Sequence, residues 1–166
     1  RQGRLTAMAS LRDIDGHPVI YDGNVYLISH SGRMVAVNLR SGVRLWEQSV
    51  GSADTPWVAG EFIYVVTTES EVICMTRREG RIIWITQLER FSDPDLRKEP
   101  VQWHGPTLAG DRVIVTSSHG YALTLSPYTG EVTGGIDLPD DSSMGPIVSN
   151  ATLYFLVEDG EIVAMR

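Results

Sequence analysis

The residues whose side chains suit catalysis or metal binding are few and scattered. The histidines are His17, His30, His104 and His119, and their spacing matches no metal-ligand motif. The sequence contains no Gly-x-Ser-x-Gly, no His-Glu-x-x-His and no glycine-rich phosphate loop. We therefore expect no catalytic residues, no metal site and no cofactor.

The single cysteine, Cys74, rules out an intrachain disulfide. In the repeat register given below it aligns with Ala36, Thr124 and Ala164, which are all small residues. A reactive thiol needs exposure and a low pKa. The alignment instead predicts a small buried side chain.

Two charged stretches lie outside the apolar runs. The first is 12–15, Arg-Asp-Ile-Asp, where aspartate suits the turns of a solvated connector. The second is 89–103, which is longer than the corresponding connection after Trp46 and mixes acidic and basic residues around two prolines. Mixed charge favours a solvent-exposed loop, and a contact with a partner is the alternative.

The overall composition narrows the function classes. The formal net charge of −7 disfavours nucleic acid as a partner, because such binding relies on Lys and Arg. No apolar run approaches the roughly 18 residues of a membrane helix. The chain starts Arg-Gln-Gly without an initiator Met or a signal-peptide pattern, so we expect a truncated or processed chain.

The elements that must position these residues repeat along the chain. When the repeats are aligned, three sets of equivalent residues appear, which we call columns: Gly32/Ser70/Gly120/Gly160, Pro18/Pro56/Pro106/Pro146 and Gly42/Gly80/Gly130. In the first two columns, successive members are 38, 50 and 40 residues apart. A period near 40 with turn residues inside each unit is typical of a repeat architecture.

Each repeat divides into short strands separated by turn residues. The middle strands are apolar on successive residues, as in 62–66, so both faces of each sheet must be covered. Sheets stacked around an axis meet this requirement, and we predict an all-β fold, a β-propeller of four-stranded antiparallel blades. A solenoid of strands is the alternative, but solenoid repeats are usually shorter.

We expect one partial propeller domain over residues 1–166. Its blades are predicted near 15–50, 52–88, 101–138 and 141–166, the last without its outer strand, and 89–103 is an insertion between two blades. The predicted strands are 18–20, 24–30, 33–38, 43–48, 56–58, 61–67, 71–76, 81–87, 106–108, 112–117, 121–126, 131–137, 146–148, 152–157 and 161–165.

The stretch from Ala36 to Trp46, Ala-Val-Asn-Leu-Arg-Ser-Gly-Val-Arg-Leu-Trp, resembles the Ala-x-Asp-x-x-x-Gly-x-x-x-Trp docking motif of quinoprotein-type (PQQ-repeat) propellers. In that superfamily the tryptophan of one blade packs on the turn of the next. The resemblance therefore implies blade-docking roles for four residues, Gly42, Trp46, Gly80 and Trp84. The third repeat has Gly134 where tryptophan is expected, so the third and fourth blades lack this contact.

Within the superfamily, the segments 11–20, 22–26, 32–46 and 159–166 are similar to the BamB family, lipoproteins of the machinery that inserts β-barrels into the outer membrane. The resemblance implies an eight-bladed ring of which this chain is the C-terminal half. It also implies a periplasmic location at the inner face of the outer membrane. A signal peptide and a lipid-anchored cysteine would then lie outside this chain.

The same resemblance implies a function and a contact surface. The function is a non-catalytic scaffold that binds the periplasmic POTRA domains of a BamA-like barrel-forming subunit, and unfolded outer-membrane proteins are a further implied partner. Asp13 and Asp15, with the adjacent Arg12, match the family's Asp-x-Asp on the surface that meets this subunit.

Other interpretations stay open. A fragment of a PQQ-dependent dehydrogenase would need a quinone pocket, calcium ligands and typically adjacent cysteines, and the single cysteine disfavours it. A generic propeller module for protein interaction is another alternative. Two half rings could also pair with each other, because a half ring leaves two faces exposed.

Overall fold

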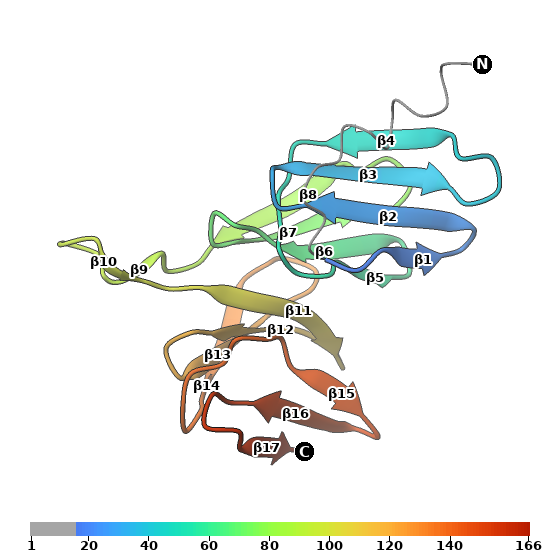
Figure 1. Cartoon of the computed structure of the whole chain (residues 1–166). Helices are drawn as coiled ribbons and strands as arrows, with labels where there is room; N and C mark the ends of the chain where they lie inside the picture. Colours follow the sequence, from blue (N-terminus) through green and yellow to red (C-terminus); the bar gives the residue numbers. More distant parts are fainter. Residues whose placement is uncertain (1–15) are drawn as a thin grey trace.

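Turn residues divide the chain into short strands, as the repeat predicts. The computed structural model describes residues 16–166, and every regular element in that part is a β-strand. Three sheets have four antiparallel strands, a fourth has three, and a separate hairpin has two. We call the first four sheets blades 1 to 4 in chain order (Figure 1). The described residues include no helix that could span a membrane.

The bounds of the strands are as follows. Blade 1 contains β1 (Val19–Tyr21), β2 (Asn24–Ser29), β3 (Arg33–Asn38) and β4 (Arg44–Gln48), and blade 2 contains β5 (Trp57–Ala59), β6 (Phe62–Val66), β7 (Glu71–Thr76) and β8 (Ile82–Gln87). The hairpin is β9 (Phe91–Asp93) and β10 (Lys98–Pro100). Blade 3 contains β11 (Trp103–Ala109), β12 (Arg112–Ser117), β13 (Tyr121–Leu125) and β14 (Val132–Asp137), and blade 4 contains β15 (Ile147–Ser149), β16 (Thr152–Leu156) and β17 (Ile162–Met165).

The predicted strands are confirmed, and most ends agree within one or two residues. Two features were not predicted. Strand β11 begins at Trp103 rather than at Pro106, because an irregular step between His104 and Thr107 lets the strand continue through the proline. The segment 89–103 also contains the hairpin β9–β10, in which Pro100 pairs with Phe91.

The blades follow one another around an axis. Strands β1, β5, β11 and β15 contact one another in that order, and each is the first strand of its sheet. Strands β4, β8 and β14 are the last strands of theirs and lie farthest from this inner row. The arrangement is that of a β-propeller, from which the hairpin β9–β10 projects to one side (Figure 1).

The hydrophobic cores lie between blades. Tyr26, Ile28 and Met34 of blade 1 are packed with Ile63 and Met75 of blade 2. Separate clusters join blade 2 to blade 3 and blade 3 to blade 4. Each fully buried side chain of this size contributes about 1.5–3 kcal/mol, so contacts between sheets dominate the stability of the fold.

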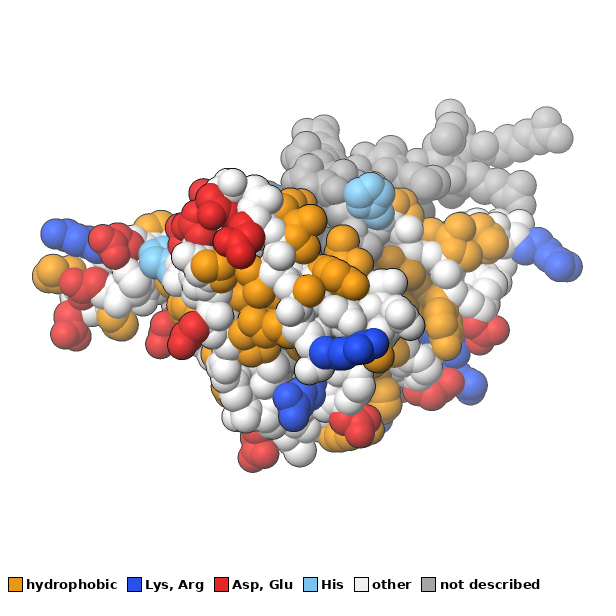
Figure 2. Space-filling model, turned by 90° about the horizontal axis from the view of Figure 1, so that it is seen from below, with side chains coloured by type: hydrophobic (Ala, Val, Ile, Leu, Met, Phe, Trp, Pro, Cys, Tyr) orange, Lys and Arg blue, Asp and Glu red, His pale blue; other side chains and the backbone are white. Residues whose placement is uncertain are grey.

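Blade 4 leaves one face uncovered within the described residues. Tyr154 and Leu156 are 37% and 41% exposed, whereas their register counterparts in blade 1, Tyr26 and Ile28, are 0% and 1% exposed. Figure 2 views the molecule from the side of this sheet, and hydrophobic side chains lie across the middle of that view. The exposed face of blade 4 is therefore apolar in the described part of the chain.

Candidate interaction surface

Successive antiparallel strands place the connections alternately at two ends of each blade. One end holds the connectors between blades and the β2–β3, β6–β7, β12–β13 and β16–β17 turns, and we call it the connector face. Backbone hydrogen bonds join its segments, for example from Thr68 N–H to the Gly51 carbonyl at 3.2 Å and from Ser118 N–H to the Gln102 carbonyl at 2.9 Å. The connector face is therefore a continuous surface made by several blades.

The base of the hairpin β9–β10 is fixed to blade 3. The indole N–H of Trp103 donates to the Glu89 carbonyl at 2.8 Å, and the Tyr121 hydroxyl donates to the Glu89 carboxylate at 3.0 Å. The Trp103 and Tyr121 rings meet edge to face with centroids 5.3 Å apart. Burial, and then the hydrogen bond and charge of Glu89, raise the pKa of Tyr121 to about 12. These contacts give the insertion a defined position on the connector face.

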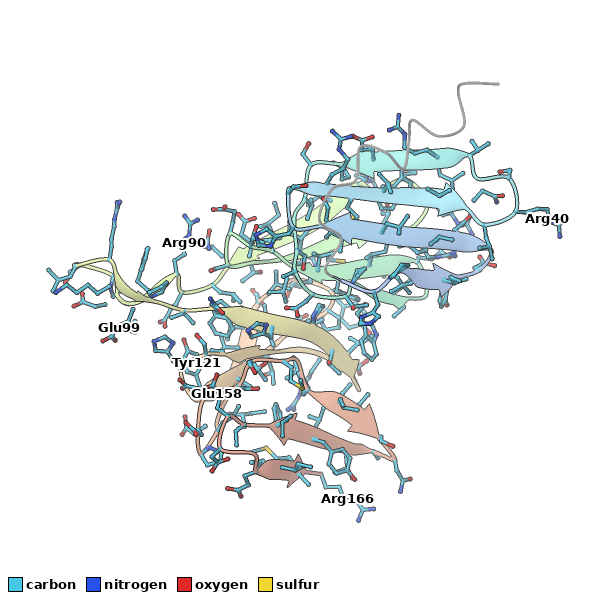
Figure 3. All side chains as sticks on the ribbon, in the orientation of Figure 1. Arg40, Arg90, Glu99, Tyr121, Glu158 and Arg166 are labelled. Carbon is cyan, nitrogen blue, oxygen red and sulfur yellow. The ribbon has the colours of Figure 1, made fainter. Side chains whose placement is uncertain are left out.

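A second set of contacts fixes the hairpin to blade 2. Arg90 forms an ion pair with Glu69 of the β6–β7 turn, and Val101 N–H donates to the Arg90 carbonyl at 3.0 Å. Within the hairpin, the Ser92 hydroxyl donates to the Glu99 carboxylate at 2.6 Å. In Figure 3, Arg90 and Glu99 point to opposite sides of the hairpin ribbon. Arg90, at the start of the hairpin, is therefore directed toward blade 2.

Near the axis, polar contacts link each blade to the next. His17 N–H donates to the Thr55 hydroxyl at 3.0 Å, and the Asp54 carboxylate lies 3.4 Å from Nδ1 of His104. The Thr107 hydroxyl donates to the Pro146 carbonyl at 2.5 Å. Each of these residues is one of the repeated prolines or lies within two positions of one. The repeat therefore places them together near the axis.

The structure brings Trp46 against the turn of blade 2. Its indole N–H donates to the Arg77 carbonyl at 2.9 Å, and a Cβ added to Gly80 would lie 2.7 Å from its ring. Trp84 has the same relation to blade 3, where it donates to the Pro127 carbonyl at 3.1 Å and covers Gly130. Trp46 is buried, whereas Trp84 is only partly buried.

Gly42 differs from its counterparts. Its φ is +69°, but a Cβ there would meet no atom within 4 Å. Of the four residues expected to dock blades, Trp46, Gly80 and Trp84 thus meet a neighbouring blade in the described part of the chain, and Gly42 does not. The glycine that packs against Trp84 is Gly130.

Blades 3 and 4 pack without a tryptophan. Phe155 and Val157 of blade 4 enter a core with Ile114 and Ala122 of blade 3. The Thr116 hydroxyl also donates to the Met144 carbonyl at 2.7 Å. The contact therefore depends on apolar side chains of β12, β13 and β16 and on residues at the end of blade 3 such as Leu138.

The sequence analysis missed Arg77, whose side chain is 5% exposed. Its guanidinium donates to the Gly60 carbonyl at 2.8 Å and to the Asp22 and Glu61 carboxylates at 3.0 and 3.3 Å. It also lies 5.0 Å from the Tyr21 ring centroid. Asp22 and Tyr21 belong to blade 1, so this arginine joins two blades; no local signal in the sequence marks it.

Cys74 is buried, in agreement with the prediction of a small interior residue. Burial raises the pKa of its thiol to about 11. No group of three or more His, Cys, Asp or Glu side chains within residues 16–166 could hold a metal ion. The cluster Arg12, Asp13 and Asp15 lies outside the described residues, and its role stays a prediction.

The sequence is similar over nearly its whole length to curated outer membrane protein assembly factors. The curated relatives include the outer membrane protein assembly factor BamB of Salmonella typhimurium (strain LT2), 28% identical over 161 residues, which cover 96% of this chain and 39% of the relative. The chain thus spans about two fifths of the length of that relative.

Solved structures agree on the fold. BamB from Moraxella catarrhalis matches 95% of this chain and 44% of its own, with a TM-score of 0.79 at 21% identity. Quinohemoprotein alcohol dehydrogenase from Comamonas testosteroni matches 77% of this chain and 21% of its own, with a TM-score of 0.58 at 18% identity. The family model described as outer membrane protein assembly factor BamB matches residues 1–86, which is more than half of the sequence. The chain therefore belongs to the BamB family of outer membrane protein assembly factors.

Proposed function

We propose that this chain is part of a non-catalytic scaffold for outer-membrane protein assembly, in the periplasm at the inner face of the outer membrane. Family membership is the observation that supports this most strongly, since the relatives are named assembly factors. The fold suits such a role, because buried cores and polar contacts join each blade to the next without a flexible linker. A rigid surface can hold a partner in a fixed orientation.

The proposed partner is a BamA-like barrel-forming subunit, bound through its periplasmic domains. The proposed contact is the connector face with Arg12, Asp13 and Asp15. In the repeat register, Asp13 and Asp15 correspond to Gly51 and Ala53 in the connector between blades 1 and 2. A pair of carboxylates there would accept hydrogen bonds from arginine or lysine across a partly hydrated interface.

A calorimetric titration of this chain with the periplasmic domains of the cognate subunit tests the proposal. We expect binding that the double variant Asp13→Arg/Asp15→Arg abolishes. The matched control is Glu79→Arg/Glu131→Arg, which makes the same change of net charge at exposed residues on the opposite end of the blades. Equal affinities for the two double variants would refute the proposed surface, and no binding by the folded chain would refute the partner.

Unfolded outer-membrane proteins are a second proposed partner. The outer strands β4, β8 and β14 each pair on one side only, and an extended segment can add to such an edge. A fluorescence titration with a peptide from an outer-membrane barrel strand tests this, and a flat titration would remove the proposal.

Quinone-dependent oxidation is the competing function. The dehydrogenase neighbour is 18% identical, a level that supports a shared fold alone. Calcium-dependent uptake of the quinone by this chain, measured by absorbance, would contradict the scaffold proposal. Self-pairing of two chains is tested separately by light scattering at high concentration, where a monomeric mass would exclude it.

A further inference from the structure

Two hollows on the connector face join into one groove beside the hairpin. The inner hollow has a volume of about 260 Å³ and the outer one about 550 Å³. Both are lined by Thr68 and Ser70 on one side and by Val101 and Gln102 on the other. We call the combined feature the hairpin groove, because the inserted hairpin forms the wall of its outer half.

The inner hollow has an apolar floor. Val66, Val101 and Trp103 line it, and each is at most 5% exposed. Asp54 and His104 also line it, with Nδ1 of His104 3.4 Å from the Asp54 carboxylate. A space of this size with an apolar floor and a polar rim suits one apolar side chain of a ligand rather than a whole cofactor.

The outer hollow has an apolar wall and basic residues. Phe91 and Pro100 face each other across the two hairpin strands, and Arg90 and Arg97 complete the lining. Arg90 is already paired with Glu69, but within residues 16–166 Arg97 has no ion-pair partner. Its backbone is held at φ +50° in the tight end of the hairpin.

Three of the acidic residues around the outer hollow accept hydrogen bonds from neutral donors, and Asp95 is exposed in the turn of the hairpin. The Asp93 carboxylate accepts from Leu96 N–H at 2.9 Å, the Glu99 carboxylate from Ser92, and the Glu89 carboxylate from Tyr121. Because Arg90 is paired with Glu69, Arg97 is the cation of the outer hollow's lining with which a carboxylate ligand could pair. An incoming carboxylate would gain a charge-assisted hydrogen bond there without displacing an existing partner.

We propose that the hairpin groove binds an extended peptide segment that places one apolar side chain in the inner hollow and one carboxylate on Arg97. Thr68, Ser70 and Gln102 supply hydrogen-bonding groups along the path of the ligand backbone. The groove does not include Asp13 or Asp15, but it lies on the connector face, which is also the proposed contact for the barrel-forming subunit.

Fluorescence anisotropy with synthetic peptides tests the proposal directly. The probes are fluorescein-labelled Gly-Ser peptides with one Phe and one Asp, separated by one to four residues. We expect one spacing to bind best, and we expect Phe→Ser or Asp→Asn in that peptide to weaken binding about tenfold. No binding by any peptide at concentrations up to about 1 mM, or equal binding by the Asp→Asn peptide, would overturn the proposal.

Variants of the protein locate the binding site. Arg97→Glu is expected to weaken binding about tenfold, and Gln102→Trp is expected to block it by filling the junction of the hollows. Arg78→Glu makes the same charge change at a residue that is 75% exposed on the opposite end of blade 2, and it should bind as the unchanged protein does. Equal effects of Arg97→Glu and Arg78→Glu would overturn the proposed position.

A measurement on the unchanged protein gives a second readout. Trp103 lines the inner hollow, whereas Trp46 and Trp84 pack between blades. In a nitrogen-15 spectrum, the bound peptide should shift the indole N–H signal of Trp103 and leave those of Trp46 and Trp84 in place. Binding without a shift of the Trp103 signal would refute the inner hollow as the site.

Discussion

The indole ring of Trp46 occupies the space that a Cβ atom on Gly80 would need. Such an atom would lie 2.7 Å from two atoms of the ring, so only glycine allows the two blades to approach this closely. The same relation joins Trp84 to Gly130, with a closest distance of 2.6 Å. Glycine at these turns therefore serves the packing between blades as well as the backbone.

Gly80→Ala and Gly42→Ala should separate these two effects. Both glycines have a left-handed backbone, at φ +67° and +69°, and this alone costs alanine about 1–2 kcal/mol. Only at Gly80 must the indole also move, and overpacking of this kind adds about 1–3 kcal/mol. Urea unfolding should show Gly80→Ala as the less stable variant. Equal midpoints would mean that the ring shifts freely.

Trp46→Ala should lower the free energy of unfolding by about 3–5 kcal/mol, because the indole is buried and its hydrogen bond to Arg77 is lost. Trp84→Ala should cost less, since Trp84 is partly exposed. Both should exceed Asp95→Ala at the exposed end of the hairpin, which should stay within about 0.5 kcal/mol. Thermal melts compare them, and a matching melting temperature for Trp84→Ala and Asp95→Ala would contradict the docking role.

Arg77→Ala should destabilise the chain by about 1–3 kcal/mol. The variant loses the hydrogen bond to the Gly60 carbonyl and the contact of the guanidinium with the Tyr21 ring. The loss should not be larger, because the Asp22 and Glu61 side chains are 71% and 56% exposed and return to water. The neighbouring Arg78→Ala breaks only a surface ion pair with Glu61 and should cost less than about 1 kcal/mol. Denaturant titration of both variants checks the difference, and a larger effect at Arg78 would be inconsistent with it.

Alkaline pH should destabilise the chain partly through Cys74. Burial raises the pKa of the thiol from 9.0 to about 11, so between these values the unfolded chain releases the proton and the folded chain keeps it. Stability from this group is full below pH 9 and falls as the pH rises toward 11, by up to about 2 kcal/mol. Cys74→Ala fits the small-residue column and should remove this part of the decline. Parallel pH profiles for the two proteins would argue against it.

The blades were predictable from sequence because their signals are local and repeated. Proline and glycine recur at fixed steps, and the apolar runs between them have the length of strands. The tryptophan contacts could be inferred from the resemblance to a docking motif. The open space around Gly42 could not be inferred, because the motif alone does not show which glycines meet a tryptophan in the fold.

The remaining contacts depend on residues that meet only in the fold. From the sequence, Arg77 looks like an ordinary surface residue. Its side chain is buried in the fold, where it contacts Asp22, a residue 55 positions earlier in the chain. Asp54 and His104 meet because their connectors converge near the axis. The hairpin has no Asn-Gly or Asp-Gly turn, and its positive φ angles fall on Arg97 and Glu99, so the usual turn signals were absent.

The attachment of the hairpin at Glu89, Trp103 and Tyr121 makes the rest of the insertion exchangeable. The contact of Trp103 uses a main-chain carbonyl, so the residues from Ser92 to Lys98 can change without altering it. A foreign epitope or a labelling peptide placed between these residues would be displayed on a preformed stem. The blades would stay as they are, and the chain would become a scaffold for grafted loops.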